Sequence, residues 1–304
     1  MRWQERDSGQ AMFEAEFDAP LQSCPLCGER ALAHFDRDFR ANQLSLCRSC
    51  GTKLVNPQFT DAHLDHFYAG YISLQDKPAA ANGKRLPHRA RPEVRSLAKL
   101  RALELLARFV KKGRILMVGC GDGLELEVAK RAGWNPEGFD VDLATTAAVA
   151  ARHGVPVHSG DIAMLARQQG SFDAVFMDQV IEHPKDPARY LRVARDLLRP
   201  GGVLYLATPN IGSLGNTWKT ALDKLGVRGR RRGKHYNTKH HLFFFTPKVL
   251  GRLLEHTFGF EVLVSRASLK PQQNPVTALL GRWFAVLDSS FLIVARKPSS
   301  SHMP

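Results

Sequence analysis

Beyond residue 113 the chain alternates short apolar runs with amphipathic stretches. This alternation is typical of a parallel sheet that carries helices on both faces, so the predicted fold class is α/β. We expect strands near 114–118, 136–140, 155–158, 172–177, 203–207, 260–265 and 290–296. Helices are expected near 93–110, 123–132, 143–153, 186–198, 247–257 and 276–286.

The first of these strands runs directly into Gly119-Cys-Gly-Asp-Gly123, which precedes a helix. Ligands of open α/β sheets bind at this place, the carboxyl end of a strand, although glycines at this spacing could equally form a tight turn. Asp140 ends the second strand, where a carboxylate can accept hydrogen bonds from both hydroxyls of a ribose. Asp161 and Ile162 follow the third strand and suit the amino group and ring face of an adenine.

Four of the five cysteines form two pairs, Cys24-Pro-Leu-Cys27 and Cys47-Arg-Ser-Cys50. Cys-x-x-Cys pairs at this separation fit a zinc ribbon, and Gly28 and Gly51 relax the backbone after each pair. Incidental buried thiols or a redox pair are the alternatives. Four protein ligands leave no open position, so we expect a structural zinc ion on Cys24, Cys27, Cys47 and Cys50.

The charge of the chain is strongly uneven. Its 43 Lys and Arg exceed its 29 Asp and Glu by 14, a surplus that suggests a nucleic acid, an anionic membrane surface or a phosphorylated substrate. Residues 209–304 alone hold 15 basic and 4 acidic residues, whereas residues 111–208 are neutral. The surplus therefore points to a localised phosphate or membrane-surface contact more than to general affinity for nucleic acid.

Residues 209–242 form an insert after the fifth strand, with a short helix expected near 214–225. Five of the seven residues in 228–234 are basic, and guanidinium groups there could clamp a diphosphate. A solvated loop is the alternative. No window is apolar enough to span a membrane, and acidic residues interrupt residues 1–20, so we expect a cytoplasmic protein that touches at most the inner membrane face.

Over residues 93–298 the chain resembles the class I S-adenosylmethionine-dependent methyltransferases. The motifs that carry the resemblance are Val118-Gly-Cys-Gly-Asp-Gly123, Gly138-Phe-Asp140, Gly160-Asp161, Phe172-Asp-Ala-Val175, Glu182-His183 and Leu198-Arg-Pro-Gly-Gly202. The resemblance implies a Rossmann-like sheet of seven strands in the order 3-2-1-4-5-7-6, with the last strand antiparallel. It implies these cofactor-binding residues: Gly119, Cys120, Gly121, Gly123, Asp140, Val141, Asp161, Ile162, Asp178 and Gln179.

Three further features resemble a bacterial subgroup associated with cell-surface polysaccharide biosynthesis: the cysteine ribbon, Leu54-Val-Asn-Pro57 with its following aromatic residues, and His241-Leu-Phe-Phe-Phe-Thr-Pro247. The subgroup implies methylation of a hydroxyl on a sugar, a glycan or a related small molecule. The basic residues in 228–234 suggest that this acceptor is linked to a nucleotide or lipid diphosphate. One departure is Met117, where the family often has an acidic residue that anchors the methionine end of the cofactor. We expect Asp178 and backbone groups to take over that contact.

A hydroxyl acceptor needs a base, and histidine has a suitable pKa. His241 and His183 are the first candidates and His240 the next, with packing or loop capping as the alternative role for each. Asp178, Glu182 and His183 also resemble part of the metal cluster of quinone-pathway O-methyltransferases. Gln179 replaces one acidic residue of that cluster, which argues against a catalytic magnesium ion.

These features divide the chain into an N-terminal tail (1–20), a zinc ribbon (21–57), a linker or lid (58–92), a methyltransferase domain (93–298) and a C-terminal tail (299–304). Two other functions stay open. The ribbon and the basic insert could bind RNA phosphates for an RNA methyltransferase, although the chain shows few aromatic residues for base stacking there. A non-catalytic binding module with a degenerate cofactor site is the third interpretation, and Met117 supports it.

Overall fold

The structure is a computed structural model, and it describes residues 4–5, 13–14, 16–68, 92–229, 232–268 and 288–299. The helix expected near 276–286 lies outside these residues, as do Arg230 and Arg231 of the basic insert. Near the N-terminus, β1 (Gln4–Glu5) pairs with β2 (Phe13–Glu14). Among the described residues, no helix is both long enough and apolar enough to cross a membrane.

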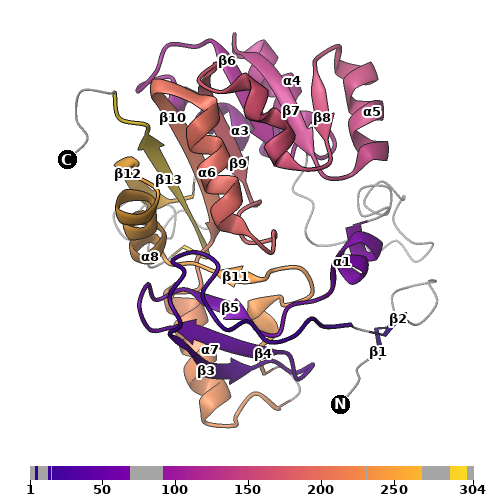
Figure 1. The fold of residues 1–304 in the computed structure, drawn as a ribbon, viewed down its shortest axis with the longest axis vertical. Helices are drawn as coiled ribbons and strands as arrows, with labels where there is room; N and C mark the ends of the chain where they lie inside the picture. The colour runs from indigo at the N-terminus through magenta and orange to yellow at the C-terminus, as the bar shows by residue number, and fades with distance from the viewer. Residues whose placement is uncertain are drawn as a thin grey trace.

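A sheet of seven strands forms the centre of the molecule (Figure 1). Its order along the sheet is β12 (Glu261–Ala267), β13 (Ser290–Arg296), β10 (Leu198–Pro209), β9 (Phe172–Asp178), β6 (Arg114–Val118), β7 (Asn135–Asp140) and β8 (Val157–Ser159). β13 is antiparallel to both neighbours, and the pairs among β10, β9, β6, β7 and β8 are parallel. The predicted order 3-2-1-4-5-7-6 with an antiparallel last strand is therefore confirmed.

Successive side chains of each strand enter different layers, as the two-residue period of a strand requires. Ile115 and Met117 join a buried cluster with residues of α3 (Pro92–Leu106), α4 (Leu124–Arg131) and α5 (Leu143–His153). Leu116 and Val118 join a second cluster with residues of α6 (Pro187–Leu197) and α8 (Pro247–Arg252). The sheet is thus covered on both faces.

Several helix boundaries differ from the predicted ones. The helix expected to reach residue 110 ends at Leu106, and the one expected over 247–257 consists of α8 followed by a π-helical turn, Leu253–Thr257. A 3-10 helix at Ile162–Gln168 was not predicted. Thr246 begins α8 by accepting a hydrogen bond from the amide of Val249, with Pro247 in the first turn, so local capping chemistry sets that start.

A second, smaller sheet lies below the large one in Figure 1. Its order is β11 (Phe243–Phe244), β5 (Lys53–Val55), β4 (Gln43–Cys47) and β3 (Leu32–Arg37), all antiparallel. α1 (Asp61–Tyr68) follows β5, and α7 (Leu214–Lys224) follows β10 close to the expected 214–225. β11 directly follows the insert (209–242) in the chain and pairs with β5. The cysteine-bearing segment and the residues just after the insert therefore share one sheet.

Candidate active site

A cavity of about 660 Å³ opens at the carboxyl ends of β6, β7 and β9. Its walls are the glycine loop after β6, the end of β7, the loop after β9, residues of α1 and α3, and residues 240–241. Such a position is where open α/β sheets bind ligands. Helix α1 belongs to the segment 58–92 that was expected as a linker or lid, and residues 69–91 of that segment lie outside the described part of the chain.

The glycine loop needs its glycines for close packing. Gly119 has a φ of +70°, and a Cβ atom there would lie 2.6 Å from Cγ2 of Val180. The amides of Gly119 and Cys120 donate to the carbonyl oxygen of Phe139 at 2.7 and 3.1 Å. The loop is therefore held against the end of β7, with backbone exposed to the cavity where a side chain would block access.

Asp140 is the acidic group at the end of β7, as predicted. Its carboxylate accepts hydrogen bonds from the amides of Gly121 at 2.9 Å and Asp142 at 3.2 Å. Burial raises the pKa of Asp140, and these two amides oppose that shift. Each carboxylate oxygen has a further lone pair, so Asp140 can still accept hydrogen bonds from two ligand hydroxyls.

A buried charge cluster lies beside the glycine loop. Lys99 of α3 donates to Glu125 of α4 and, at 2.6 Å, to Asp178 at the end of β9. Burial raises the pKa of Glu125 to about 7; the charge of Asp178 acts in the same direction, whereas Lys99 opposes it. Met117 is fully buried among apolar side chains, so Glu125 and Asp178 provide the acidic character that the sequence lacks at that position.

Three histidines gather at the other end of the cavity. Nδ1 of His183 lies 2.9 Å from the carbonyl oxygen of His240 and 3.2 Å from the hydroxyl of Tyr68. The ring centroid of His183 lies 5.2 Å from that of His240 and 5.0 Å from that of His241. Burial lowers the pKa values of His183, His240 and His241 to about 4, 3 and 2, so all three rings are neutral near pH 7.

Comparison with known proteins identifies the family. Residues 88–265, more than half of the chain, match the family model described as Methyltransferase domain. The chain belongs to this methyltransferase family. Two relatives are named ubiquinone biosynthesis O-methyltransferase: one from Caulobacter vibrioides is 31% identical and covers 59% of this chain and 73% of its own, and one from Ralstonia nicotianae is 31% identical and covers 62% and 77%. The expected enzyme class, an S-adenosylmethionine-dependent methyltransferase, is confirmed.

Solved structures agree with this fold. The Burkholderia thailandensis 1,6-didemethyltoxoflavin-N1-methyltransferase, solved with S-adenosylhomocysteine, gives a TM-score of 0.52 at 17% identity and covers 88% of this chain and 99% of its own. A methyltransferase from Mesorhizobium loti gives 0.50 at 20% identity and covers 67% and 99%. At these identities the likeness concerns the fold alone.

Of the remaining predicted cofactor-binding residues of the methyltransferase, some line the cavity and others do not. Val141 and Gln179 line the cavity, and Gln179 has a φ of +60° while its amide donates to the carbonyl oxygen of Ala207. Among the described residues, Asp161, Ile162, Gly123 and Asp178 are not part of the cavity wall. Asp161 caps the 3-10 helix and pairs with Arg189 at 2.6 Å, whereas Ile162 is buried.

The four cysteines of the methyltransferase converge as the spacing predicts. Sγ of Cys24 lies 3.8 Å from Sγ of Cys50, and Sγ of Cys27 lies 3.6 Å from Sγ of Cys47. Zinc–sulfur bonds of about 2.3 Å at tetrahedral angles place the sulfur atoms about 3.8 Å apart. Gly28 and Gly51 have φ values of +80° and +83°, so glycine does relax the backbone after each pair. This donor set fits a zinc ion.

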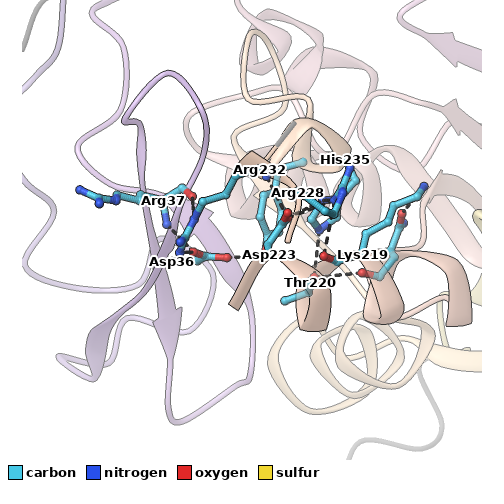
Figure 2. A network of polar contacts seen from close by, with 11 residues as sticks. Asp36, Arg37, Lys219, Thr220, Asp223, Arg228, Arg232 and His235 are labelled. Carbon is cyan, nitrogen blue, oxygen red and sulfur yellow. Dashed lines mark hydrogen bonds and ion pairs between the residues drawn. The ribbon is translucent and has the colours of Figure 1, made fainter. Parts of the chain in front are cut away.

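The basic insert makes contacts that the sequence did not indicate (Figure 2). Arg232 pairs with Asp36 of β3 at 2.7 Å, and Arg228 pairs at 3.1 Å with Asp223, which is buried at the end of α7. The ring of His235 lies against the same carboxylate, 3.6 Å away. Arg228 and Arg232 therefore fasten the insert to itself and to the cysteine-bearing segment, a role that differs from both the phosphate clamp and the solvated loop considered for the basic residues.

Proposed function

We propose that this cavity binds S-adenosylmethionine and directs its methyl group to a hydroxyl of a small-molecule acceptor. The observation that carries the proposal is that one cavity combines the glycine loop and Asp140 at one end with the three histidines at the other. Methyl transfer is a direct displacement, so the enzyme contributes mainly by aligning its two substrates. A single cavity with two chemically different ends suits that task.

The residues present fit the cofactor. Asp140 would accept hydrogen bonds from the ribose hydroxyls, and the loop at Gly119 lets the ligand approach the backbone. Glu125 lines the cavity and would bind the methionine ammonium group, because its Oε2 atom is buried and accepts no hydrogen bond from the described residues. Arg95, 2.9 Å from Asp122 at the rim, would face the methionine carboxylate. The cofactor supplies a methyl group that its sulfonium already activates.

The end of the cavity at His183, His240 and His241, here called the acceptor end, holds the hydroxyl. Neutral imidazoles carry a lone pair that can accept the proton of the acceptor, and burial makes these three rings weaker bases than an exposed histidine. The aromatic ring of Phe67 packs against His240, and that of Tyr68 packs against His183. The assignment of His241 or His183 as the general base stays a prediction.

For the acceptor we propose a sugar or glycan linked to a nucleotide or lipid diphosphate. The support is the subgroup pattern, which combines a cysteine module with the His241–Pro247 run. Strand β11 of that run pairs with β5 of the cysteine module in one small sheet beside the acceptor end. The relatives named ubiquinone biosynthesis O-methyltransferase also carry an O-methyltransferase name, which favours a hydroxyl acceptor. Zinc on the four cysteines would hold this small sheet in place.

Calorimetric titration with S-adenosylmethionine tests the cofactor site. The wild-type chain should bind, and Asp140→Asn should bind about 10-fold to 100-fold more weakly, because two charge-assisted hydrogen bonds are weakened. Asp196→Asn, at an exposed position of α6, should bind like the wild type. Wild-type protein without measurable affinity would refute the proposed function.

The acceptor is tested separately with a labelled methyl donor. Nucleotide-diphosphate sugars and catechols are offered in parallel, and we expect label in the sugar fraction. Label in the catechols alone would refute the sugar assignment and retain the methyltransferase function.

A further inference from the structure

Nitrogen atoms of three histidines meet at the acceptor end. His183 follows β9, whereas His240 and His241 precede β11. Each histidine offers one ring nitrogen, and these three nitrogen atoms all lie within 4.8 Å of one another. All three side chains are partly exposed and line the cavity, so a small ion can reach them from solvent.

Backbone hydrogen bonds hold this cluster together. Nδ1 of His183 donates its proton to the carbonyl oxygen of His240 at 2.9 Å, because a carbonyl can only accept. The lone pair of neutral His183 is then on Nε2. The amides of Leu242 and Phe243 donate to the carbonyl oxygen of Glu182 at 2.8 and 3.1 Å, which fixes the backbone next to the other two histidines. A carbonyl partner at the second ring nitrogen is usual for a histidine that binds a metal.

We propose that His183, His240 and His241 form a binding site for one divalent transition-metal ion of the zinc, cobalt or nickel type. Three neutral imidazoles are a ligand set that these ions prefer to the oxygen ligands of magnesium or calcium. Metal–nitrogen bonds of about 2.0–2.1 Å in a tetrahedral site place the nitrogens about 3.3 Å apart. Ring rotation about the Cβ–Cγ bonds can close the remaining gap, because that torsion is broad for histidine.

The role of the ion rests on the proposed function, whereas the binding site itself does not. Three protein ligands leave a coordination position open to the cavity. An acceptor hydroxyl in that position releases its proton more readily, because the cation stabilises the oxyanion. The acceptor O–H bond breaks and its proton passes to solvent, the oxygen–methyl bond forms, and the sulfur–methyl bond breaks with its electron pair left on sulfur. With the ion bound, the three histidines serve as ligands, which replaces the general-base role that the sequence predicts for His241 or His183.

Cobalt titration of the full chain tests the site. Protein stripped of metal under reducing conditions is titrated with Co²⁺ while bound cobalt per chain and the visible spectrum are recorded. We expect one equivalent with intense thiolate charge-transfer absorption, from the four cysteines, and a second without it. His240→Gln and His241→Gln should each weaken the second equivalent at least about 10-fold and leave the first unchanged. His66→Gln, an exposed histidine of α1, is the matched control.

A single equivalent with the thiolate spectrum alone, or a second equivalent that survives both substitutions, would overturn the site. The cysteine spectrum shows in the same sample that each variant is folded. Titration with S-adenosylmethionine in the presence of EDTA tests the proposed function independently. Two cobalt equivalents without cofactor binding would support the metal site and refute its role in methyl transfer.

Discussion

Lys99 donates hydrogen bonds to two carboxylates beside the glycine loop, an area here called the cofactor end of the cavity. One of these carboxylates, Glu125, has a raised pKa. Glu125 is buried, and its pKa of about 7 reflects burial and the neighbouring charge of Asp178, which together outweigh Lys99. In the unfolded chain a glutamate has a pKa of about 4.3. Between these values the folded protein holds a proton that the unfolded chain has released, so the free energy of unfolding falls as pH rises through this range.

We therefore expect Glu125→Gln to flatten the pH dependence of stability. The amide cannot ionise, so the variant should lose less thermal stability than the wild type between about pH 5 and about pH 7.5. Scanning calorimetry at the two pH values measures the difference. Glu127→Gln on the same helix is the control, because the Glu127 side chain is partly exposed and pairs across one helical turn with Arg131. Equal slopes in wild type and Glu125→Gln would contradict the assigned pKa.

Single residues also show how far sequence reasoning reaches. The places of Asp140 and Gly119 in the cavity wall could be predicted, because each residue lies at or directly after the end of a strand. Lys99 and Glu125 could not, since each occupies an ordinary helical position and they meet only after α3 and α4 pack together. The histidines were named individually, but their contact depends on where residues 240–241 return to the sheet.

Among the elements, the insert is joined to the cysteine-bearing segment by an ion pair between Arg232 and the buried carboxylate of Asp36. Burial raises the pKa of Asp36, whereas hydrogen bonds from Arg232, the amide of Arg37 and Tyr236 lower it. The lowering effects are larger together, so the net shift of the pKa is downward. The carboxylate is almost fully buried, whereas the Arg232 side chain is about one-third exposed. Asp36 therefore contributes mainly through its satisfied hydrogen bonds.

Asp36→Ala should reduce the free energy of unfolding by about 1–3 kcal/mol, because the Tyr236 hydroxyl and Arg232 lose their buried acceptor. Chemical denaturation measures the loss. Arg192→Ala removes an exposed pair with Asp186 at 3.9 Å and should change stability by less than about 0.5 kcal/mol. If both variants cost the same, the pair does not fasten the insert.

The elements predicted best are those with local signals. All seven strands of the large sheet fall at or near their expected positions. Buried strands such as β6 and β9 consist mainly of apolar residues and are therefore easy to find in the sequence. The pairing of β11 with β5 was not predicted, since nothing within Phe243–Phe244 indicates which distant strand it will join. The turn at Leu253–Thr257 was missed for a different reason: its apolar spacing is that of an ordinary helix end.

At the scale of the whole molecule, the two sheets share one buried core. Cys24, Cys47 and Leu44 belong to the same apolar cluster as Leu116 and Val118 of the large sheet. A disturbance at the metal site should therefore reach the acceptor end through β4, β5 and β11. The cofactor end, built on the opposite cluster and the glycine loop, should be less affected.

Removal of the zinc ion proposed for the four cysteines should separate these two regions. After treatment with a strong chelator, or in Cys24→Ser, we expect amides of β4, β5 and β11 to exchange hydrogen much faster while those of β6 and β9 stay protected. Mass spectrometry of exchanged peptides measures both. Cys120→Ser, at the cysteine outside the metal cluster, should retain zinc and the wild-type pattern in the small sheet. Uniform loss of protection across both sheets would show a single cooperative unit.

The position of β11 in the chain also has a consequence for how the protein is made. During synthesis the four cysteines and β3 to β5 emerge first, so a metal ion can organise them early. Their sheet gains its fourth strand only when Phe243–Phe244 has been translated, after most of the large sheet. Closing so long a loop is slow, and until then the edge of β5 lacks its neighbour. The acceptor end is therefore among the last parts of the enzyme to form.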